Sequence, residues 1–153
     1  MPKETSEEIL TFACKVITPL RQVYSADKVV NAKFAATTGD LELQPRHEPL
    51  LSPLAVGYLY LTELQPGGET TEKVLNVNGG FLDLNGELAT VFAYSAETAE
   101  EIDLERAKAA HTRAQERLDE VKRQGPSADK LDEARAERAL YRAISRIKLC
   151  DLR

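Results

Sequence analysis

The chain has 153 residues, of which 42% are hydrophobic and 29% are charged, and its formal net charge is −5. These proportions are typical of a folded globular protein and exclude an intrinsically disordered chain. No stretch reaches the roughly 18 consecutive apolar residues of a membrane-spanning helix, and two cysteines near opposite ends, Cys14 and Cys150, suggest neither a disulfide framework nor a zinc site.

The N-terminus is polar and acidic, and no apolar segment of the kind found in secretory signals follows it. We expect residues 1–8 to form a disordered tail. For the same reason we expect the chain to reside in the cytoplasm, where both cysteines stay reduced.

Residues 9–96 show the pattern of an antiparallel β-sandwich, because short apolar and β-branched runs alternate with turn residues. Many short strands with no helix between them favour a sandwich over an α/β fold. Asn85-Gly86 predicts a two-residue hairpin with a type I′ turn, and Thr38-Gly39-Asp40 predicts a second turn. The six predicted strands are 10–17, 28–35, 57–64, 73–77, 80–84 and 88–94.

Residues 97–153 are expected to form an antiparallel two-helix hairpin, because strong helix formers dominate and neither Pro nor Gly occurs before Gly125-Pro126. That pair ends the first helix, and Ser127 or Asp129 can cap the second. Each helix carries an apolar stripe, consisting of Ile102, Ala107, Ala110, Ala114, Leu118 and Val121 in the first and of Leu131, Ala136, Leu140, Ala143, Ile144 and Ile147 in the second. A seam made mostly of alanine buries little apolar area, so we expect a hairpin that opens at modest cost.

Charge is unevenly distributed between these two parts. Residues 1–98 contain 7 Lys and Arg against 13 Asp and Glu, whereas residues 99–153 contain 13 against 12. The segment from Arg142 to the C-terminus contains four basic residues and only one acidic residue, Asp151. The C-terminal end is therefore a candidate for contact with an anion or an acidic partner.

Several short motifs follow one another in a distinctive order. They are Ile17-Thr18-Pro19, His47-Glu48-Pro49-Leu50, Asn78-Gly79-Gly80-Phe81-Leu82, and Ser95-Ala96-Glu97 leading to Glu101-Ile102-Asp103. Together with the order of sandwich and hairpin, these motifs resemble the epsilon subunit family of bacterial F-type ATP synthases, called delta in mitochondria. The resemblance covers nearly the whole chain, but residues 39–47 lack the glycine-rich stretch of the family's middle loop.

The resemblance implies a non-catalytic subunit of the central stalk, which couples rotor rotation to ATP synthesis and inhibits ATP hydrolysis through its C-terminal helices. The implied partners are the gamma subunit and the c-ring for the sandwich, and the alpha and beta subunits for the helices. The implied location is the cytoplasmic face of the inner (plasma) membrane, where the protein is peripheral and associates only through the complex. No cofactor is required, and ATP is expected as a regulatory ligand.

A nucleotide motif lies at the start of the hairpin. The segment Ile102-Asp103-Leu104-Glu105-Arg106-Ala107 resembles the Ile/Leu-Asp-x-x-Arg-Ala motif of ATP-binding epsilon subunits. By this resemblance, Glu97 and Asp103 would line the adenosine side of the ligand.

Four arginines are predicted to converge across the hairpin. Arg106 and Arg113 are seven residues apart on one helix face, and Arg142 and Arg146 form an i, i+4 pair on the second helix. Guanidiniums stay charged and present a planar fork of donors, which suits the oxygens of a triphosphate.

Other interpretations of these residues stay open. Asp103 can simply favour the positive end of its helix dipole, and the arginines can make exposed ion pairs worth about 0–1 kcal/mol each. The arginines can also meet acidic loops of the catalytic subunits when the hairpin extends.

A function of a different class is a free-standing adaptor whose basic hairpin binds an anionic partner. The nearly balanced charge of the hairpin argues against nucleic acid, because nucleic-acid domains usually have a pI above about 9. For a small independent enzyme, the sequence offers no phosphate loop and no nucleophile with a paired base, and His47 and His111 lack metal-ligand spacing.

Overall fold

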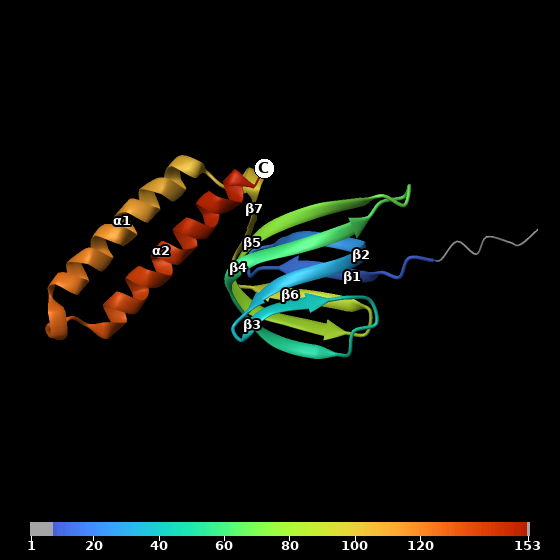
Figure 1. The fold of residues 1–153 in the computed structure, drawn as a ribbon, viewed down its shortest axis with the longest axis horizontal. Coiled ribbons are helices and arrows are strands. Elements are labelled where there is room, and N and C mark those ends of the chain that lie inside the picture. Colours follow the sequence, from blue (N-terminus) through green and yellow to red (C-terminus); the bar gives the residue numbers. More distant parts are fainter. Residues whose placement is uncertain (1–7, 153) are drawn as a thin grey trace, which may run out of the picture.

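The computed structural model describes residues 8–152 and consists of a strand-rich unit and a helical hairpin (Figure 1). The hairpin extends away from the strands, and the loop between its helices lies farthest from them. The predicted fold class, an N-terminal β-sandwich followed by an antiparallel two-helix hairpin, is confirmed. The predicted tail, residues 1–8, lies outside the described residues except for Glu8, which is exposed.

The strands pair in the order β1-β6-β5-β4-β2-β3, and an additional pairing of β1 with β2 closes the sheet on itself. Neighbouring strands are antiparallel except β1 and β6, which run parallel. A short seventh strand pairs with β5. The strands are β1 (Phe12–Ile17), β2 (Gln22–Ala36), β3 (Gly39–Leu43), β4 (Leu50–Leu64), β5 (Thr70–Asn85), β6 (Leu88–Ala93) and β7 (Ala96–Thr98).

Several predicted strand boundaries are wrong. The predicted strands 73–77 and 80–84 are one strand, β5, because Gly79 and Gly80 adopt positive φ angles and let the strand bend while it stays paired with β4. The turn predicted at residues 38–40 lies earlier, at Thr37 and Thr38, since Gly39 already pairs with Ala36 in the β2–β3 ladder. The predicted start of the hairpin unit at residue 97 falls inside β7.

The hairpin predicted at Asn85-Gly86 is present, but its turn is shifted by one residue. Asn85 pairs with Leu88, so the two loop residues are Gly86 and Glu87. Of these two only Gly86 has a positive φ, 62°. This matches the type II′ pattern, with glycine at the first central position, rather than the predicted type I′.

Alternate side chains of the strands fill one apolar core. Its largest fully buried members are Leu43, Leu59, Leu61, Leu75, Leu82, Val16, Val29 and Val91. Cys14 also lies in this core, and burial raises the pKa of its thiol to about 12. A thiol that stays protonated at neutral pH is a packing residue without nucleophilic reactivity.

The hairpin consists of α1 (Leu104–Arg123) and α2 (Lys130–Asp151), joined by a 3₁₀ turn at Gly125–Ser127. Gly125 has a φ of 62°, as expected for the residue that ends a helix. Asp129 caps α2, where its carboxylate accepts a hydrogen bond of 2.8 Å from the backbone nitrogen of Leu131. Within residues 8–152 no helix has the length and apolarity required to cross a membrane.

The seam between the helices is built mainly from alanine, as predicted. Its buried residues are Ala107, Ala114, Leu118 and Val121 from α1 and Ala136 and Ala143 from α2. Leu131, predicted to join this stripe, is 51% exposed instead, because it lies at the first turn of α2, where the chain enters from the connecting loop. Among the described residues a single ion pair joins the helices, with 3.4 Å between Arg117 and Asp132.

Because the seam buries little apolar area, we predict that amides in α1 and α2 exchange hydrogen faster than amides in β2, β4 and β5. Substituting Leu118, the bulkiest buried side chain of the seam on α1, by Ala should destabilise the hairpin by about 2–5 kcal/mol. Hydrogen exchange followed by mass spectrometry measures both effects. Equal protection of hairpin and sandwich in the unmodified chain would contradict the weak seam.

Candidate functional site

The C-terminal part of α2 is attached to the sheet by polar contacts. The hydroxyl of Tyr58 in β4 donates a hydrogen bond of 2.9 Å to the backbone oxygen of Ser145. The hydroxyl of Ser145 in turn donates a hydrogen bond to the side-chain oxygen of Asn76 in β5. The Asn76 side chain is fully buried. The amide nitrogen of Asn76 has no hydrogen-bond partner among the described residues, which makes this attachment less stable than a fully paired one.

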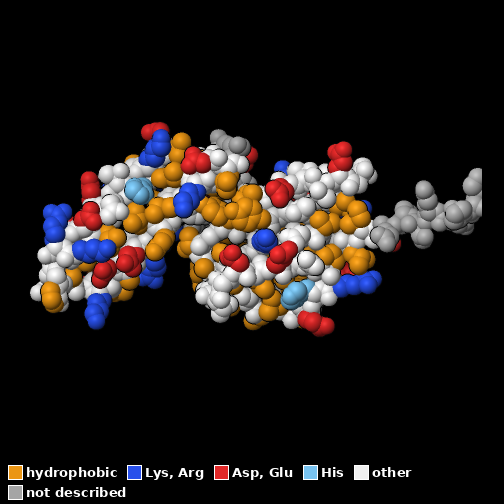
Figure 2. All heavy atoms as spheres, viewed as in Figure 1, with side chains coloured by type: hydrophobic (Ala, Val, Ile, Leu, Met, Phe, Trp, Pro, Cys, Tyr) orange, Lys and Arg blue, Asp and Glu red, His pale blue; other side chains and the backbone are white. Residues whose placement is uncertain are grey.

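A small apolar cluster lies beside these polar contacts. Leu149 of α2 is 1% exposed and packs with Ile102 and Ala107, which come from the segment leading into α1 and from its first turn. Figure 2 shows hydrophobic side chains gathered where the hairpin meets the strands, whereas charges of both signs are interspersed over the hairpin itself. The cluster therefore fixes both helices against the same edge of the sheet.

An ion pair completes the attachment. Arg146 of α2 donates two hydrogen bonds to Glu97 of β7, at 2.7 Å from Nε and 3.0 Å from a terminal nitrogen. About 30% of each side chain is exposed. A bidentate, half-buried guanidinium–carboxylate pair is among the stronger ion pairs in proteins and holds both side chains in one orientation.

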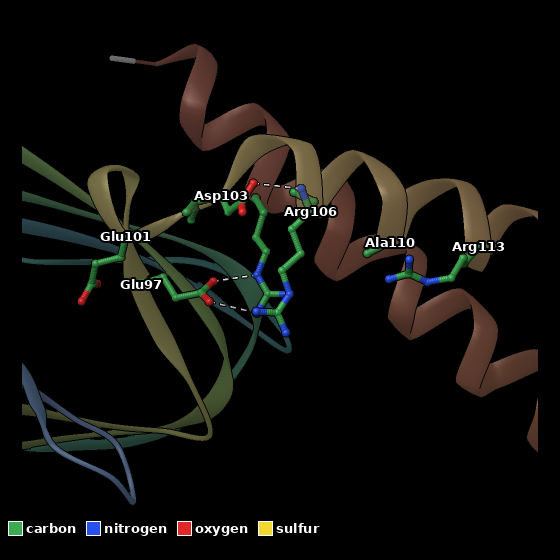
Figure 3. Close-up of a pocket in the computed structure, with 9 residues that line it drawn as sticks. Glu97, Glu101, Asp103, Arg106, Ala110 and Arg113 are labelled. Carbon is green, nitrogen blue, oxygen red and sulfur yellow. Dashed lines mark hydrogen bonds and ion pairs between the residues drawn. The ribbon is translucent and has the colours of Figure 1, made fainter.

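A cavity of about 330 Å³ opens between the sheet and the hairpin. Five of the six predicted site residues line it: Glu97, Asp103, Arg106, Arg113 and Arg146. Figure 3 shows Arg106 and Arg113 projecting from α1 toward the side where Glu97 lies. The structure thus brings together acids and arginines from β7, both helices and the linker between the two units.

Arg142 is the predicted site residue that does not line this cavity. It lines an adjoining cavity of about 450 Å³ that runs along the hairpin and shares Ala110, Arg113 and Arg146 with the first. The two cavities form one continuous groove. Arg142 therefore lies farther from the sheet than Arg146, toward the hairpin end of the groove, and the four arginines that were predicted to converge are distributed over both cavities.

Asp103 has a structural role in addition to its place in the groove. It is the N-cap of α1, and its carboxylate accepts a hydrogen bond of 3.0 Å from the backbone nitrogen of Arg106 (Figure 3). This supports the alternative that the acid favours the positive end of its helix. One carboxylate oxygen makes this bond, so the second oxygen stays available to a ligand.

The arginines differ from ordinary surface arginines in their pairing. Arg106, Arg113 and Arg142 make no ion pair with any residue between 8 and 152, whereas Arg146 is paired with Glu97. The alternative of exposed ion pairs therefore does not describe these three side chains. Unpaired guanidiniums along one groove raise the local positive potential and suit a polyanionic ligand.

Sequence reasoning missed Glu101, which also lines the first cavity. Its carboxylate accepts a hydrogen bond of 2.9 Å from the backbone nitrogen of Thr98, completing a capping box with the Thr98 side chain. It also pairs with Arg21, which directly precedes β2. The Thr-x-x-Glu spacing of a capping box is a local signal that identifies this residue.

Comparison with known proteins gives matches along nearly the whole chain. Residues 11–99 match the family described as ATP synthase, Delta/Epsilon chain, beta-sandwich domain, and residues 100–151 match ATP synthase, Delta/Epsilon chain, long alpha-helix domain. The chain is 39% identical over 137 residues to the ATP synthase epsilon chain of Bacillus velezensis, covering 90% of this chain and 95% of that one. It is 37% identical over 135 residues to the ATP synthase epsilon chain of Nitratidesulfovibrio vulgaris, covering 88% and 92%.

Solved structures share the fold at lower sequence identity. A chain in the Euglena gracilis mitochondrial ATP synthase (OSCP/F1/c-ring) superposes with a TM-score of 0.70 at 19% identity, covering 100% of this chain and 88% of that one. A chain in the central stalk/c-ring part of the Tetrahymena thermophila mitochondrial ATP synthase gives 0.52 at 13% identity, covering 92% and 93%. At these identities the likeness concerns the fold.

We predict that Glu101 contributes to stability only above a threshold pH. The hydrogen bond from the Thr98 backbone, reinforced by Arg21, lowers the pKa of the folded carboxyl below the ordinary value of a glutamate side chain, 4.5. The contribution is therefore fully present above the unfolded pKa and is lost as the pH falls through the lower folded pKa. The difference in free energy of unfolding between the unmodified chain and Glu101→Gln should shrink as the pH is lowered below 4.5, in denaturant titrations at several pH values.

As a control, Glu105→Gln removes an exposed acid of α1 whose partner is Lys108, three residues away. Its effect on the free energy of unfolding should be small at every pH. A Glu101→Gln difference that stayed constant between neutral pH and the acid range would refute the role given to the carboxylate.

Proposed function

The chain belongs to the ATP synthase delta/epsilon family, and from this membership we propose that it is a non-catalytic central-stalk subunit that couples rotor rotation to ATP synthesis. We further propose that its helical hairpin inhibits ATP hydrolysis and senses ATP. The curated relatives support the first part by their name, ATP synthase epsilon chain, and by identity along both structural units. As part of such a complex the protein would be peripheral, on the cytoplasmic face of the membrane.

The observation that carries the ATP-sensing proposal is the groove between the sheet and the hairpin. Its walls come from β7, α1 and α2, and three of its arginines have no ion-pair partner among the described residues. A triphosphate in this groove would contact the two arginines of α1, Arg106 and Arg113, and at the same time the two arginines of α2, Arg142 and Arg146. It would therefore bridge two helices that an alanine seam holds together only weakly.

Inhibition and ATP sensing are then one linked equilibrium. A ligand that binds only the closed, attached hairpin shifts the population toward that state by its differential affinity. When the hairpin opens, the same arginines become available to acidic loops of the alpha and beta subunits. ATP would thus oppose the inhibitory form, and loss of ATP would favour it.

The sandwich offers a surface for the gamma subunit and the c-ring. Phe81 and Phe92 are directly paired on β5 and β6, their ring centroids are 6.3 Å apart, and they are 47% and 43% exposed. Leu51, 71% exposed, lies on the same face, since its neighbour Pro53 pairs with Phe81 and residues two apart share a face. Apolar side chains clustered on one face of a sheet mark a protein-binding surface.

We predict saturable binding of ATP to the purified chain, and its loss in both Arg106→Ala and Arg142→Ala, measured by titration calorimetry. Each substitution removes a guanidinium that makes no ion pair in the described chain, so it leaves no unpaired acid behind. We expect each to weaken ATP binding at least about tenfold, the effect of one charge-assisted phosphate contact.

Arg138→Ala is the matched control, because Arg138 lies on α2 outside both cavities of the groove and bonds only its own helix, at Ala134. It should bind ATP like the unmodified chain. No binding in the unmodified chain would remove ATP sensing from the proposal and leave regulation to the mechanical position of the hairpin. Salt-sensitive DNA binding instead would favour the adaptor.

We predict that the cognate gamma subunit forms a stable complex with the chain and that Phe81→Ala with Phe92→Ala weakens this complex about tenfold or more. Leu131→Ala, which removes an exposed apolar side chain from the hairpin, should leave the affinity unchanged. Surface plasmon resonance with immobilised gamma subunit measures all three. Failure to form any complex with folded gamma subunit would overturn the stalk assignment.

A further inference from the structure

The groove continues beyond the residues that a triphosphate requires. Its hairpin end is lined by two more arginines, Arg117 of α1 and Arg135 of α2, with Asp132 between them. Asp132 lies 3.4 Å from Arg117 and 3.5 Å from Arg135. Neither arginine belongs to the sequence motif, and the proposed ATP site leaves both without a function.

The distribution of charge orients a ligand along the groove. The cavity beside the sheet is lined by three carboxylates, Glu97, Glu101 and Asp103, together with three arginines. The cavity along the hairpin is lined by five arginines and one carboxylate, and its remaining lining residues are alanines. A ligand with a neutral, hydroxyl-bearing part and a polyanionic part therefore binds with its sugar toward the sheet and its phosphates toward the hairpin loop.

The helix geometry sets how far the basic lining extends. Arg117 lies four residues beyond Arg113 on α1, about 6 Å along the helix axis. Arg135 lies seven residues before Arg142 on the antiparallel α2, about 10 Å toward the same end. The two arginines thus extend the phosphate-facing lining past the level at which Arg113, Arg142 and Arg146 contact a triphosphate.

We propose that the groove binds nucleotides with a phosphate chain longer than a triphosphate more tightly than ATP, with Arg117 and Arg135 contacting the phosphates beyond the third. Asp132 opposes this contact, because it already pairs with both arginines and would lie next to the added phosphate. The inference rests on the proposed nucleotide site and specifies the ligand class of its far end.

The test is calorimetric titration of the full chain with ATP and with adenosine 5′-tetraphosphate, in one buffer without divalent metal. The tetraphosphate should bind about fivefold more tightly, the size of a single good exposed ion pair. In the double variant Arg117→Ala, Arg135→Ala the two ligands should bind equally, while ATP affinity stays within about twofold. In Asp132→Asn the preference for tetraphosphate should rise by a further factor of about three, because both arginines lose Asp132 as a competing partner, while Arg117 keeps Glu120 at 3.6 Å.

The matched control is the double variant Arg123→Ala, Arg138→Ala. It removes the same charge from the same two helices, but these arginines bond the backbone of their own helices, at Asp119 and Ala134, and do not line the groove. It should keep the full preference for tetraphosphate, which separates a local contact from a general effect of net charge. Circular dichroism and thermal unfolding verify that each variant is folded.

The outcomes separate this inference from the site on which it rests. ATP binding with no preference for tetraphosphate, or a preference that survives in the Arg117→Ala, Arg135→Ala variant, overturns the inference and leaves the ATP site intact. A folded chain that binds neither ligand overturns both.

Discussion

The attachment of the last turns of α2 to β4, β5 and β7 determines most of what this protein can do. Ser145 bonds Tyr58 and Asn76, Arg146 bonds Glu97, and Leu149 packs on Ile102. The groove has three walls only while these contacts hold. If α2 moved away, Arg146 and Arg142 would leave Glu97 and Asp103 behind, and the acids and arginines would no longer line a common groove.

The attachment of α2 to the sheet combines a polar centre with weakly packed helices. Its centre is polar, the side-chain nitrogen of Asn76 is buried with no partner in the described part of the chain, and the helices beyond it meet mainly through alanines. A leucine-rich interface of the same size would be more stable but would also hold the hairpin permanently. A small net stability of the attached state, which the alanine seam predicts, would allow ligand contacts of a few kcal/mol to shift its population.

Much of the candidate site can be predicted from local sequence patterns. The rest depends on contacts between residues that are far apart in the sequence. Arg106 and Arg113 lie on one face of α1, as the helical repeat alone predicts, and of the two caps that the sequence allowed for α2 the structure uses Asp129. Strand β3 was missed because Gly39 and Asp40 read as turn residues, whereas pairing with β2 holds them extended. The contact of Asn76 with Ser145 joins residues 69 positions apart, and no local pattern predicts it. Arg142 shares a helix face with Arg146, but only Arg146 reaches the cavity beside the sheet, and this depends on where α2 packs against the strands.

The polar character of the attachment also affects which surfaces the subunit exposes before it joins a complex. An opened hairpin would expose the Tyr58 hydroxyl, the Asn76 amide and the Glu97 carboxylate, all of which water solvates readily. It would also uncover the apolar cluster of Leu149, Ile102 and Ala107, whereas the alanine seam would add only small apolar patches. A newly made or displaced subunit with its hairpin open would therefore present one compact adhesive surface for aggregation or chaperone capture, at the place where α2 leaves the sheet, until the hairpin closes or partners assemble around it.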